Sequence, residues 1–261
     1  MSDLIEFTVE DGVARIVLNR QSAFNAFDQP LASALRDALE QLRARSDARC
    51  LVVTGAGKAF CAGGDVVGFN AAGDAAPSAI RSIVLHLHAA VNHLLALEMP
   101  VIAAINGPTA GAGMGLFMGA DLAIASDKAN FTMAYTAIGA SPDGSSTFFL
   151  PRLVGLRRAM ELTLTNRRLS AEEALDWGLV NEVVPADELD AVVAKRAAAL
   201  AAGPTKAFAT ARRLLADSFQ TAAQAQMERE IEGIAAMGAT DDFREGCAAF
   251  VERRRAEFKG S

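Results

Sequence analysis

The feature that most constrains this chain is a glycine-rich segment that follows a short apolar run. The run 101–105 predicts a buried strand, after which the chain turns at 106–108 and opens an apolar helix ending near Asp121. Residues 111–113 are small, so a ligand can approach the backbone itself. The first N–H groups of a helix have no partner within it and lie at the positive end of its dipole. The segment therefore predicts an anion site, or an oxyanion hole if the charge is transient.

The same segment has two less specific interpretations. Residues 99–120 carry no charged side chain, are long enough to span a bilayer, and place glycines four residues apart, as membrane helix pairs do. The Asn106-Gly107-Pro108 turn interrupts any continuous helix and no basic flank sets a topology, so we do not expect a membrane protein. A glycine-rich turn that binds no ligand is the other alternative, and this motif alone leaves it open.

The composition favours a cytosolic protein that does not bind nucleic acid. The chain has 261 residues, 51% of them hydrophobic, which suits one α/β domain or one domain with a helical appendage. Its net charge of −6 argues against nucleic acid as the main partner. Three cysteines without paired spacing indicate a reducing compartment and no zinc site. The first residues lack the regions of a signal peptide, so we expect a cytoplasmic protein.

The periodicity along the chain predicts an α/β fold with a partly parallel sheet. A hairpin is expected to turn at Asp11-Gly12, and a helix with regularly spaced leucines is followed by a buried strand at 50–54. Strand, helix and strand in this order are typical of crossover units. A strand at 130–133 is expected to extend the same sheet. From residue 187 onward the pattern is almost entirely helical, and we divide the chain into a core (1–200) and a helical region (201–261).

A second glycine-rich loop, residues 55–65, follows the strand at 50–54. It lies at the carboxyl end of a strand, where α/β proteins bind ligands, but it lacks the spacing of a P-loop or a dinucleotide motif. Two such loops can each supply one N–H group to a single oxygen. Cys61 in this loop is interpreted as a packing residue rather than a nucleophile, because no histidine or cation lies nearby in sequence.

Two further sets of polar residues are candidates for chemistry. Asp143 lies in a Pro-Asp-Gly turn, whose local sequence favours a structural role. The functional alternative is a carboxylate that transfers protons, with a pKa raised by apolar neighbours at 148–150. His86, His88 and His93 share one predicted helix, but no carboxylate or cysteine joins them. We expect packing or surface roles for the histidines and no metal site.

Together these motifs resemble the crotonase superfamily, also called enoyl-CoA hydratase/isomerase, and the resemblance covers essentially the whole chain. Its motifs are the loop 58–65, the segment 105–116, a capping-box helix at 169–174 followed by 177–180, and the stretches 242–246 and 258–260. Each motif alone is weak, whereas their combination is highly specific for the family.

The resemblance implies a crotonase (ClpP-like) spiral of ββα turns with a C-terminal helical trimerisation region, assembled as a homotrimer or a dimer of trimers. It implies an acyl-CoA thioester as substrate and no cofactor. Ala62 and Ala112 look like the two backbone N–H donors to the thioester oxygen, and Lys259 like a residue that reaches a neighbour's CoA. The residues implied to bind the substrate or its CoA are Lys58, Ala59, Phe60, Ala62, Gly63, Gly64, Asp65, Val66, Gly111, Ala112, Tyr135 and Lys259.

Two departures from the family pattern bear on the reaction. The glutamates that hydratases of this family use fall at Gly115 and Tyr135, and neither residue transfers a proton as a carboxylate does. Ordinary syn-hydration is therefore not expected. Asp143 remains, and its Ser-Pro-Asp-Gly context with the run 149–155 is similar to isomerases of bacterial phenylacetate degradation. Those isomerases rearrange a ring-epoxide-CoA and shift enoyl double bonds.

The sequence thus leads to one main hypothesis and two alternatives. The main hypothesis is an isomerase that moves an enoyl-CoA double bond or rearranges a ring-CoA. In it the thioester oxygen lies between the donors Ala62 and Ala112, and Asp143 transfers the proton. One alternative is a hydratase-type lyase that uses Asp143 and water. The other is a scaffold that binds CoA without catalysis. Whether the acyl group is linear or a ring, and which pathway it belongs to, stay open.

Overall fold

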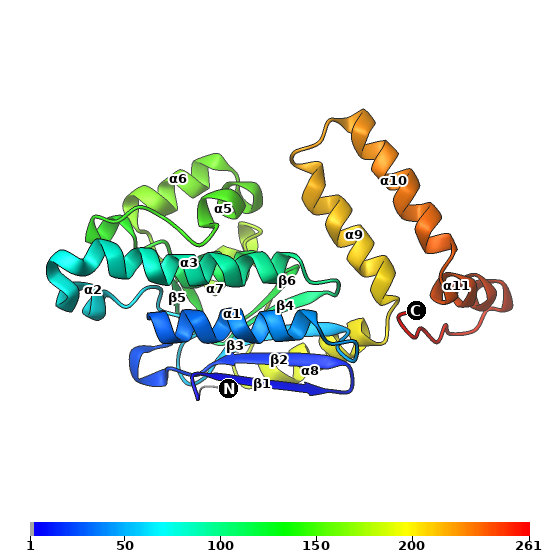
Figure 1. Cartoon of the computed structure of the whole chain (residues 1–261), viewed down its shortest axis with the longest axis horizontal. Helices are drawn as coiled ribbons and strands as arrows, with labels where there is room; N and C mark the ends of the chain where they lie inside the picture. The colour runs from blue at the N-terminus through cyan, green and yellow to red at the C-terminus, as the bar shows by residue number, and fades with distance from the viewer. Residues whose placement is uncertain (1–2) are drawn as a thin grey trace.

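The computed structural model describes residues 3–261, which form two β-sheets surrounded by helices (Figure 1). The larger sheet has six strands in the order β1-β2-β3-β4-β6-β9, and the smaller has three in the order β5-β7-β8. The strands of the larger sheet are β1 (Ile5–Glu10), β2 (Val13–Leu18), β3 (Cys50–Gly55), β4 (Val101–Ile105), β6 (Leu122–Ser126) and β9 (Glu182–Val184). Those of the smaller sheet are β5 (Thr109–Ala110), β7 (Asn130–Thr132) and β8 (Leu169–Ser170).

The larger sheet begins with the predicted hairpin and continues as a parallel sheet. β1 and β2 pair antiparallel around Asp11 and Gly12, both with positive φ (48° and 78°), as a tight hairpin turn requires. Every later pair in this sheet is parallel, because a helix or a long connection returns the chain to the same edge. The strand expected at 130–133 is β7, which belongs to the smaller sheet, so that placement was wrong.

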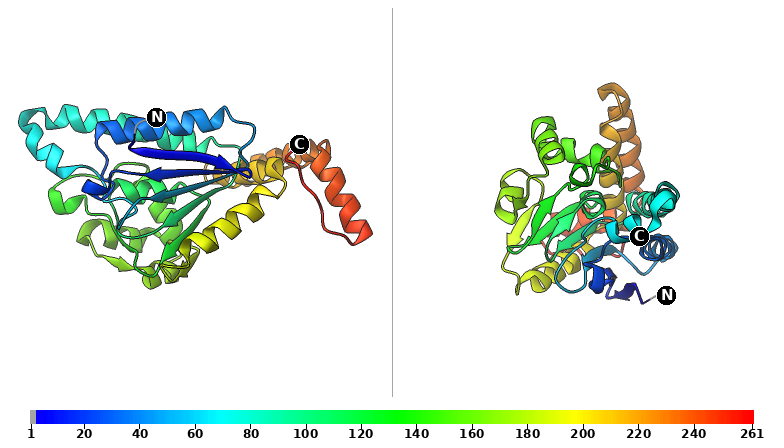
Figure 2. Two further views of the ribbon diagram at one scale, coloured as in Figure 1. Left: turned by 90° about the horizontal axis from the view of Figure 1, so that it is seen from below. Right: turned by 90° about the vertical axis from the view of Figure 1, so that its left-hand side faces the viewer.

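Helices cover both faces of the larger sheet, as Figure 2 shows. On one face α1 (Gln29–Arg43) packs against α3 (Ala76–Leu95), and on the other lies α8 (Leu189–Ala201). Successive residues of β3 point to opposite faces: Leu51 and Val53 join the core under α1 and α3, and Val52 joins the core under α8. This double burial explains the continuous apolar run that predicted the strand.

Short helices complete the part of the chain that surrounds the larger sheet. They are α2 (Val66–Ala72), α4 (Ala112–Met118), α5 (Ser146–Val154), α6 (Leu156–Thr165) and α7 (Ala171–Asp176). The predicted capping box at the start of α7 is present, since Ser170 Oγ accepts the Glu173 N–H and the Glu173 side chain accepts the Ser170 N–H. Within residues 3–261, no helix combines the length and the apolar character that crossing a membrane requires.

The C-terminal helices α9 (Thr205–Ser218), α10 (Ala223–Gly238) and α11 (Asp241–Glu252) project beyond the sheet (Figures 1 and 2). Two arginines tie their base to the core. Arg212 pairs with Asp121 (2.6 Å) and donates to three main-chain carbonyls at the end of α3, and Arg49 donates to Gly203 O (2.6 Å) and Thr205 Oγ1 (3.0 Å). The projecting helices begin with α9 at Thr205, and the division of the chain at residue 200 stays a prediction.

Candidate active site

Asp143 lies in the turn that leads into α5, and three contacts fix this turn. The Tyr135 hydroxyl donates a hydrogen bond of 2.7 Å to the Asp143 Oδ1. The Asp143 carbonyl accepts the N–H (3.1 Å) and the Oγ–H (2.6 Å) of Ser146, the buried first residue of α5. The Gly144 N–H donates to His88 Nε2 on α3 at 3.1 Å. The side chain of Asp143 and the peptide bond that follows it are therefore both held in place.

The surroundings of Asp143 affect its proton affinity in opposite directions. Burial raises the pKa of Asp143, and the Tyr135 hydroxyl and His88 partly offset this rise. Burial, followed by the charge of Asp143, raises the pKa of Tyr135 well above its usual range. Tyr135 therefore stays protonated and acts as the hydrogen-bond donor of the pair. A carboxyl group with a raised pKa is suited to accept a proton from carbon and return it.

The two glycine-rich loops lie against each other beside this carboxylate. Cys61 and Thr109 form a parallel bridge, and the Ala110 N–H donates to Cys61 O at 2.9 Å. The contact depends on a missing side chain, since a Cβ at Gly113 would lie 2.6 Å from the Cys61 carbonyl oxygen. The start of α4 is thus packed directly on the loop that follows β3.

Ala112 places a free backbone donor in this region. It is the first residue of α4, so its N–H has no partner within the helix, and it makes no hydrogen bond with residues 3–261. The Asp143 turn lies over it, because a Cβ on Gly144 would lie 3.9 Å from Ala112 Cα. A Cβ on Gly111 would lie 3.8 Å from Cζ of Tyr135. The carboxylate, the tyrosine and this N–H therefore belong to one site.

Ala62, the other expected donor, is already engaged. Its N–H donates to the Phe24 carbonyl at 3.0 Å, so it is not free to bind a substrate oxygen. The expectation for Ala62 was therefore wrong in the structure. The sequence does not show this bond, because Phe24 lies 38 positions earlier, in the loop after β2.

The free donor of the same loop is Gly64. Phe27 bonds to both of its neighbours: the Phe27 N–H donates to Gly63 O (2.7 Å), and the Phe27 carbonyl accepts the Asp65 N–H (3.0 Å). In a parallel bridge of this pattern the N–H of the residue in between points to the other side. The Gly64 N–H makes no hydrogen bond with any residue from 3 to 261. Gly64 and Ala112 are thus the donors that the geometry leaves open.

Gly115, where the family's first glutamate falls, has no room for any side chain. A Cβ there would lie 2.0 Å from the carbonyl oxygen of Gly144 and 3.2 Å from its Cα. The Asp143-Gly144 turn therefore occupies the space into which a side chain at position 115 would extend. A side chain at position 115 and the Asp143 turn in its present place therefore exclude each other.

The remaining predicted residues occupy the loop after β3 and the C-terminus. Asp65 caps α2 through its contact with the Gly68 N–H (3.0 Å) and pairs with Arg20 (2.7 Å), which together lower its pKa. Ala59 and Phe60 are buried, and Lys58 and Val66 are exposed. Lys259 is exposed. It belongs to the C-terminal tail, which lies at the opposite end of the molecule from α2 (Figure 1).

Cys61 is not placed to act as a nucleophile. It is fully buried, burial raises the pKa of its thiol to about 12, and its Sγ donates to Asn25 O at 3.1 Å. The interpretation of Cys61 as a packing residue is therefore confirmed.

His88 is the site residue that sequence reasoning missed. Its expected role was packing or surface exposure, because nothing near it in sequence suggests a catalytic partner. Only the contact of α3 with the Asp143 turn brings them together. Within residues 3–261 no group of three or more histidine, cysteine or acidic side chains is arranged to hold a metal ion.

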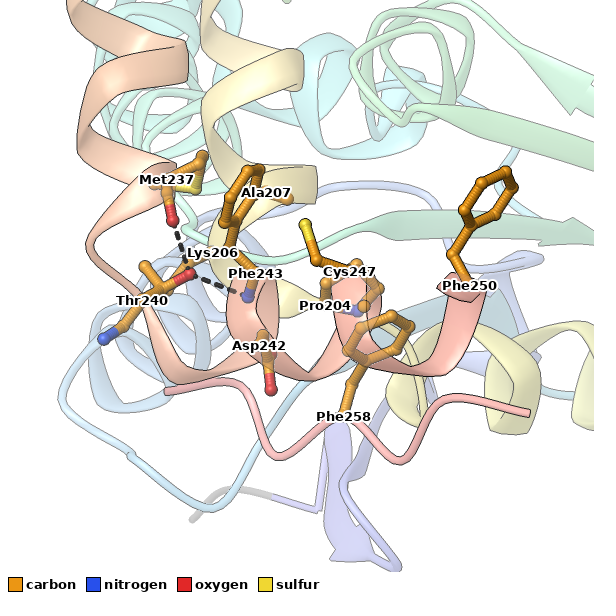
Figure 3. A pocket seen from close by; sticks show the side chains of 11 residues that line it. Pro204, Lys206, Ala207, Met237, Thr240, Asp242, Phe243, Cys247, Phe250 and Phe258 are labelled. Carbon is orange, nitrogen blue, oxygen red and sulfur yellow. Dashed lines mark hydrogen bonds between the residues drawn. The ribbon is translucent and has the colours of Figure 1, made fainter. Parts of the chain in front are cut away.

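A separate, largely apolar cavity of about 330 Å³ lies in the C-terminal helical region (Figure 3). It opens to solvent between α9, the end of α10, α11 and the tail, and Phe243, Cys247 and Phe258 line it. The tail is fixed beside it, because the Asp242 carboxylate accepts the N–H groups of Lys259 (2.7 Å) and Gly260 (2.8 Å). This cavity contains none of the residues that converge at Asp143.

Comparison with known proteins agrees with this fold. The family model described as enoyl-CoA hydratase/isomerase matches residues 8–261. The chain therefore belongs to the enoyl-CoA hydratase/isomerase family, and its fold is the crotonase fold of that family.

Relatives with three different names illustrate the range of the family. The chain is 36% identical over 263 residues to the 1,2-epoxyphenylacetyl-CoA isomerase of Escherichia coli, covering 100% of both chains. It is 37% identical over 242 residues to 4-chlorobenzoyl coenzyme A dehalogenase-2 of an Arthrobacter species, covering 92% of this chain and 87% of the relative. The crystal structure of an enoyl-CoA hydratase from Bacillus anthracis matches with a TM-score of 0.93 and 32% identity over 99% of this chain and 100% of the other.

Proposed function

We propose that this protein is an acyl-CoA isomerase that moves a carbon–carbon double bond by proton transfer through Asp143. The observation that carries the proposal is the position of the Asp143 turn, with its half-buried carboxylate, over the free Ala112 N–H, in a site that lacks both family glutamates. A single carboxylate suffices for an isomerisation, because the same group removes and returns one proton.

The proposed reaction begins with the thioester oxygen between the N–H groups of Gly64 and Ala112. Asp143 removes a proton from C2 of a 3-enoyl-CoA, and the negative charge that moves onto the thioester oxygen is stabilised by the two N–H groups. The protonated Asp143 then returns the proton at C4, which gives the conjugated 2-enoyl-CoA and restores the carboxylate. The thioester itself acidifies C2, so the proposal requires no cofactor.

An ultraviolet assay with a 3-enoyl-CoA tests this function, because the conjugated enoyl thioester of the product adds an absorbance that the substrate lacks. We expect turnover by the wild type and a loss of about 100- to 10,000-fold in Asp143→Asn, the usual contribution of a general base. Asp187→Asn, a change at an exposed acidic residue in the turn between β9 and α8, is the matched control. Equal rates in wild type and Asp143→Asn would overturn the proposal.

A water-dependent reaction at the same carboxylate is the second candidate. The observation that favours it is His88, which lies beside the Asp143 turn although an isomerisation by one carboxylate has no need of it. The relative named as a 4-chlorobenzoyl-CoA dehalogenase makes displacement of a ring substituent the form to test, with hydration of an enoyl-CoA as the other. Incubation in heavy-oxygen water, with halide release measured in parallel, separates these reactions from isomerisation, which incorporates no label.

The assembly belongs to the proposal as well. We expect a homotrimer or a dimer of trimers, because apolar side chains on α9 and α10 are exposed in the single chain. These residues are Leu215, Phe219, Met227, Ile231 and Ile234. Light scattering coupled to size-exclusion chromatography tests the assembly, and a monomer at micromolar concentration would contradict it.

A further inference from the structure

The hydroxyl group of Tyr135, a residue expected to bind the substrate, contacts the Asp143 carboxylate directly. Its oxygen lies 2.7 Å from Asp143 Oδ1, and 3.5 Å from the Asp143 main-chain oxygen. The ring is buried, with 9% of its surface exposed, and its tip lies over Gly111 at the start of α4. The tyrosine therefore reaches the carboxylate from a fixed position in the core.

The contact makes the two carboxylate oxygens of Asp143 different from each other. Oδ1 is occupied by the Tyr135 hydroxyl, and Oδ2 receives no hydrogen bond from residues 3–261. Ser146 and His88 already hold the peptide bond that follows Asp143, through its carbonyl oxygen and its N–H group respectively. The side chain of Asp143 can still rotate about its single bonds, and the hydrogen bond from Tyr135 restricts that rotation.

On this geometry we propose that Tyr135 is a positioning residue, which holds Asp143 by Oδ1 so that Oδ2 faces the substrate as the proton-transferring oxygen. The inference deepens the proposed function and rests on it. A hydrogen bond donated to a carboxylate favours the charged form, so Tyr135 also keeps this half-buried group ionised at a lower pH than its burial alone allows.

The titratable groups that face Asp143 are few. Tyr135 approaches from the loop before η3 (Thr136–Ile138), and His88 from α3. The residues of α4 carry no titratable side chain, and the first turns of α5, residues 146–151, carry none either. A change in the titration of Asp143 after substitution of Tyr135 can therefore be assigned to the lost hydroxyl.

The test uses Tyr135→Phe, which keeps the ring and removes the hydroxyl, with Thr136→Val as the matched control. Thr136 also loses a hydroxyl, but that hydroxyl bonds to Thr163 O and not to Asp143. We expect the acid limb of the kcat/KM profile to move to higher pH in Tyr135→Phe. The loss in kcat/KM should then be roughly 10-fold greater at pH 5 than at pH 8. An unchanged acid limb would overturn the inference, since a merely structural tyrosine alters rate or stability without moving it.

A second readout needs no catalysis. Tyr135 is the only tyrosine of the chain, so growth on 3-fluorotyrosine labels this position alone. We expect its fluorine resonance to titrate in the acid range in wild type and not in Asp143→Asn. A resonance insensitive to Asp143→Asn would contradict the contact itself. Normal titration of the label in an inactive wild type would refute the proposed isomerase and leave the tyrosine–aspartate pair standing.

Discussion

The Asp143 turn and the two glycine-rich loops face the same site but offer it different chemistry. The turn contributes a side chain, held by Tyr135, His88 and Ser146. The loops contribute main-chain N–H groups, whose positions depend on how closely the loops approach each other. A side-chain function can be removed by one isosteric substitution, whereas a main-chain function is disturbed only by a change that moves the backbone. The predictions below test this difference.

Asp143→Asn should have the largest effect on rate with the smallest effect on binding. We expect kcat to fall about 100- to 10,000-fold, because the amide cannot accept the C2 proton. The affinity for a saturated acyl-CoA, measured by calorimetry, should stay within about threefold, since the loops are untouched. A parallel loss of affinity would show that the turn and the loops do not act separately.

Gly113→Ala should damage the loops and leave the carboxylate in place. The new Cβ would lie 2.6 Å from Cys61 O, so the start of α4 must move away from the loop after β3. We expect a loss of about 100- to 1,000-fold in kcat, as for removal of an oxyanion donor. Gly119→Ala at the end of the same helix is the control, since its Cβ would meet the flexible end of Leu94 at 3.3 Å and would lie no closer than 3.5 Å to any backbone atom. Equal kcat values in the two variants would refute this role for the close contact.

Gly115→Glu should not restore a hydratase, although it returns the family's residue. Its Cβ would collide with the Gly144 carbonyl at 2.0 Å and push the Asp143 turn off α4. We expect isomerisation to fall by about 100-fold or more, with no gain of hydration measured by the loss of enoyl absorbance. Hydration at an appreciable rate would mean that the turn and the glutamate fit together, contrary to the packing described above.

Asp143→Asn should also make the protein more stable near neutral pH. Burial raises the pKa of this carboxyl above its value in the unfolded chain, so the charged form is disfavoured in the folded state. The wild type therefore loses stability as the pH rises through the pKa of Asp143, and the amide does not. Thermal melts should show a higher Tm for the variant at pH 8, with a difference that shrinks toward pH 4. A lower Tm for the variant at pH 8 would contradict this sign.

The smallest effect is expected at Cys61, which lies in the site's loop but does no chemistry. Cys61→Ala should keep kcat within about threefold and cost about 1–2 kcal/mol of stability, for a lost buried contact to Asn25 O. Iodoacetamide should modify the exposed Cys247 before the two buried cysteines and leave activity intact. Inactivation that follows modification of Cys61 would break the distinction between packing and catalysis in this loop.

The sequence by itself determined the local parts of this site. The strand 101–105, the glycine-rich start of α4 and the capping box at Ser170 follow from periodicity and from the geometry of glycine and of helix ends, which are properties of neighbouring residues. The absence of both family glutamates is likewise visible in the letters alone. The buried role of Cys61 followed because no activating group stands near it in sequence.

Only the tertiary structure decided which of these parts act together. Whether Ala62 or Gly64 offers a free N–H depends on bonds to Phe24 and Phe27, far earlier in the chain. The place of His88 beside the turn depends on how α3 crosses it, and the place of Asp143 depends on the empty position at Gly115. Each is set by the packing of segments that are distant in the chain. In the loop after β3, a shift of two residues decides which N–H group faces the site. No local pattern carries that information.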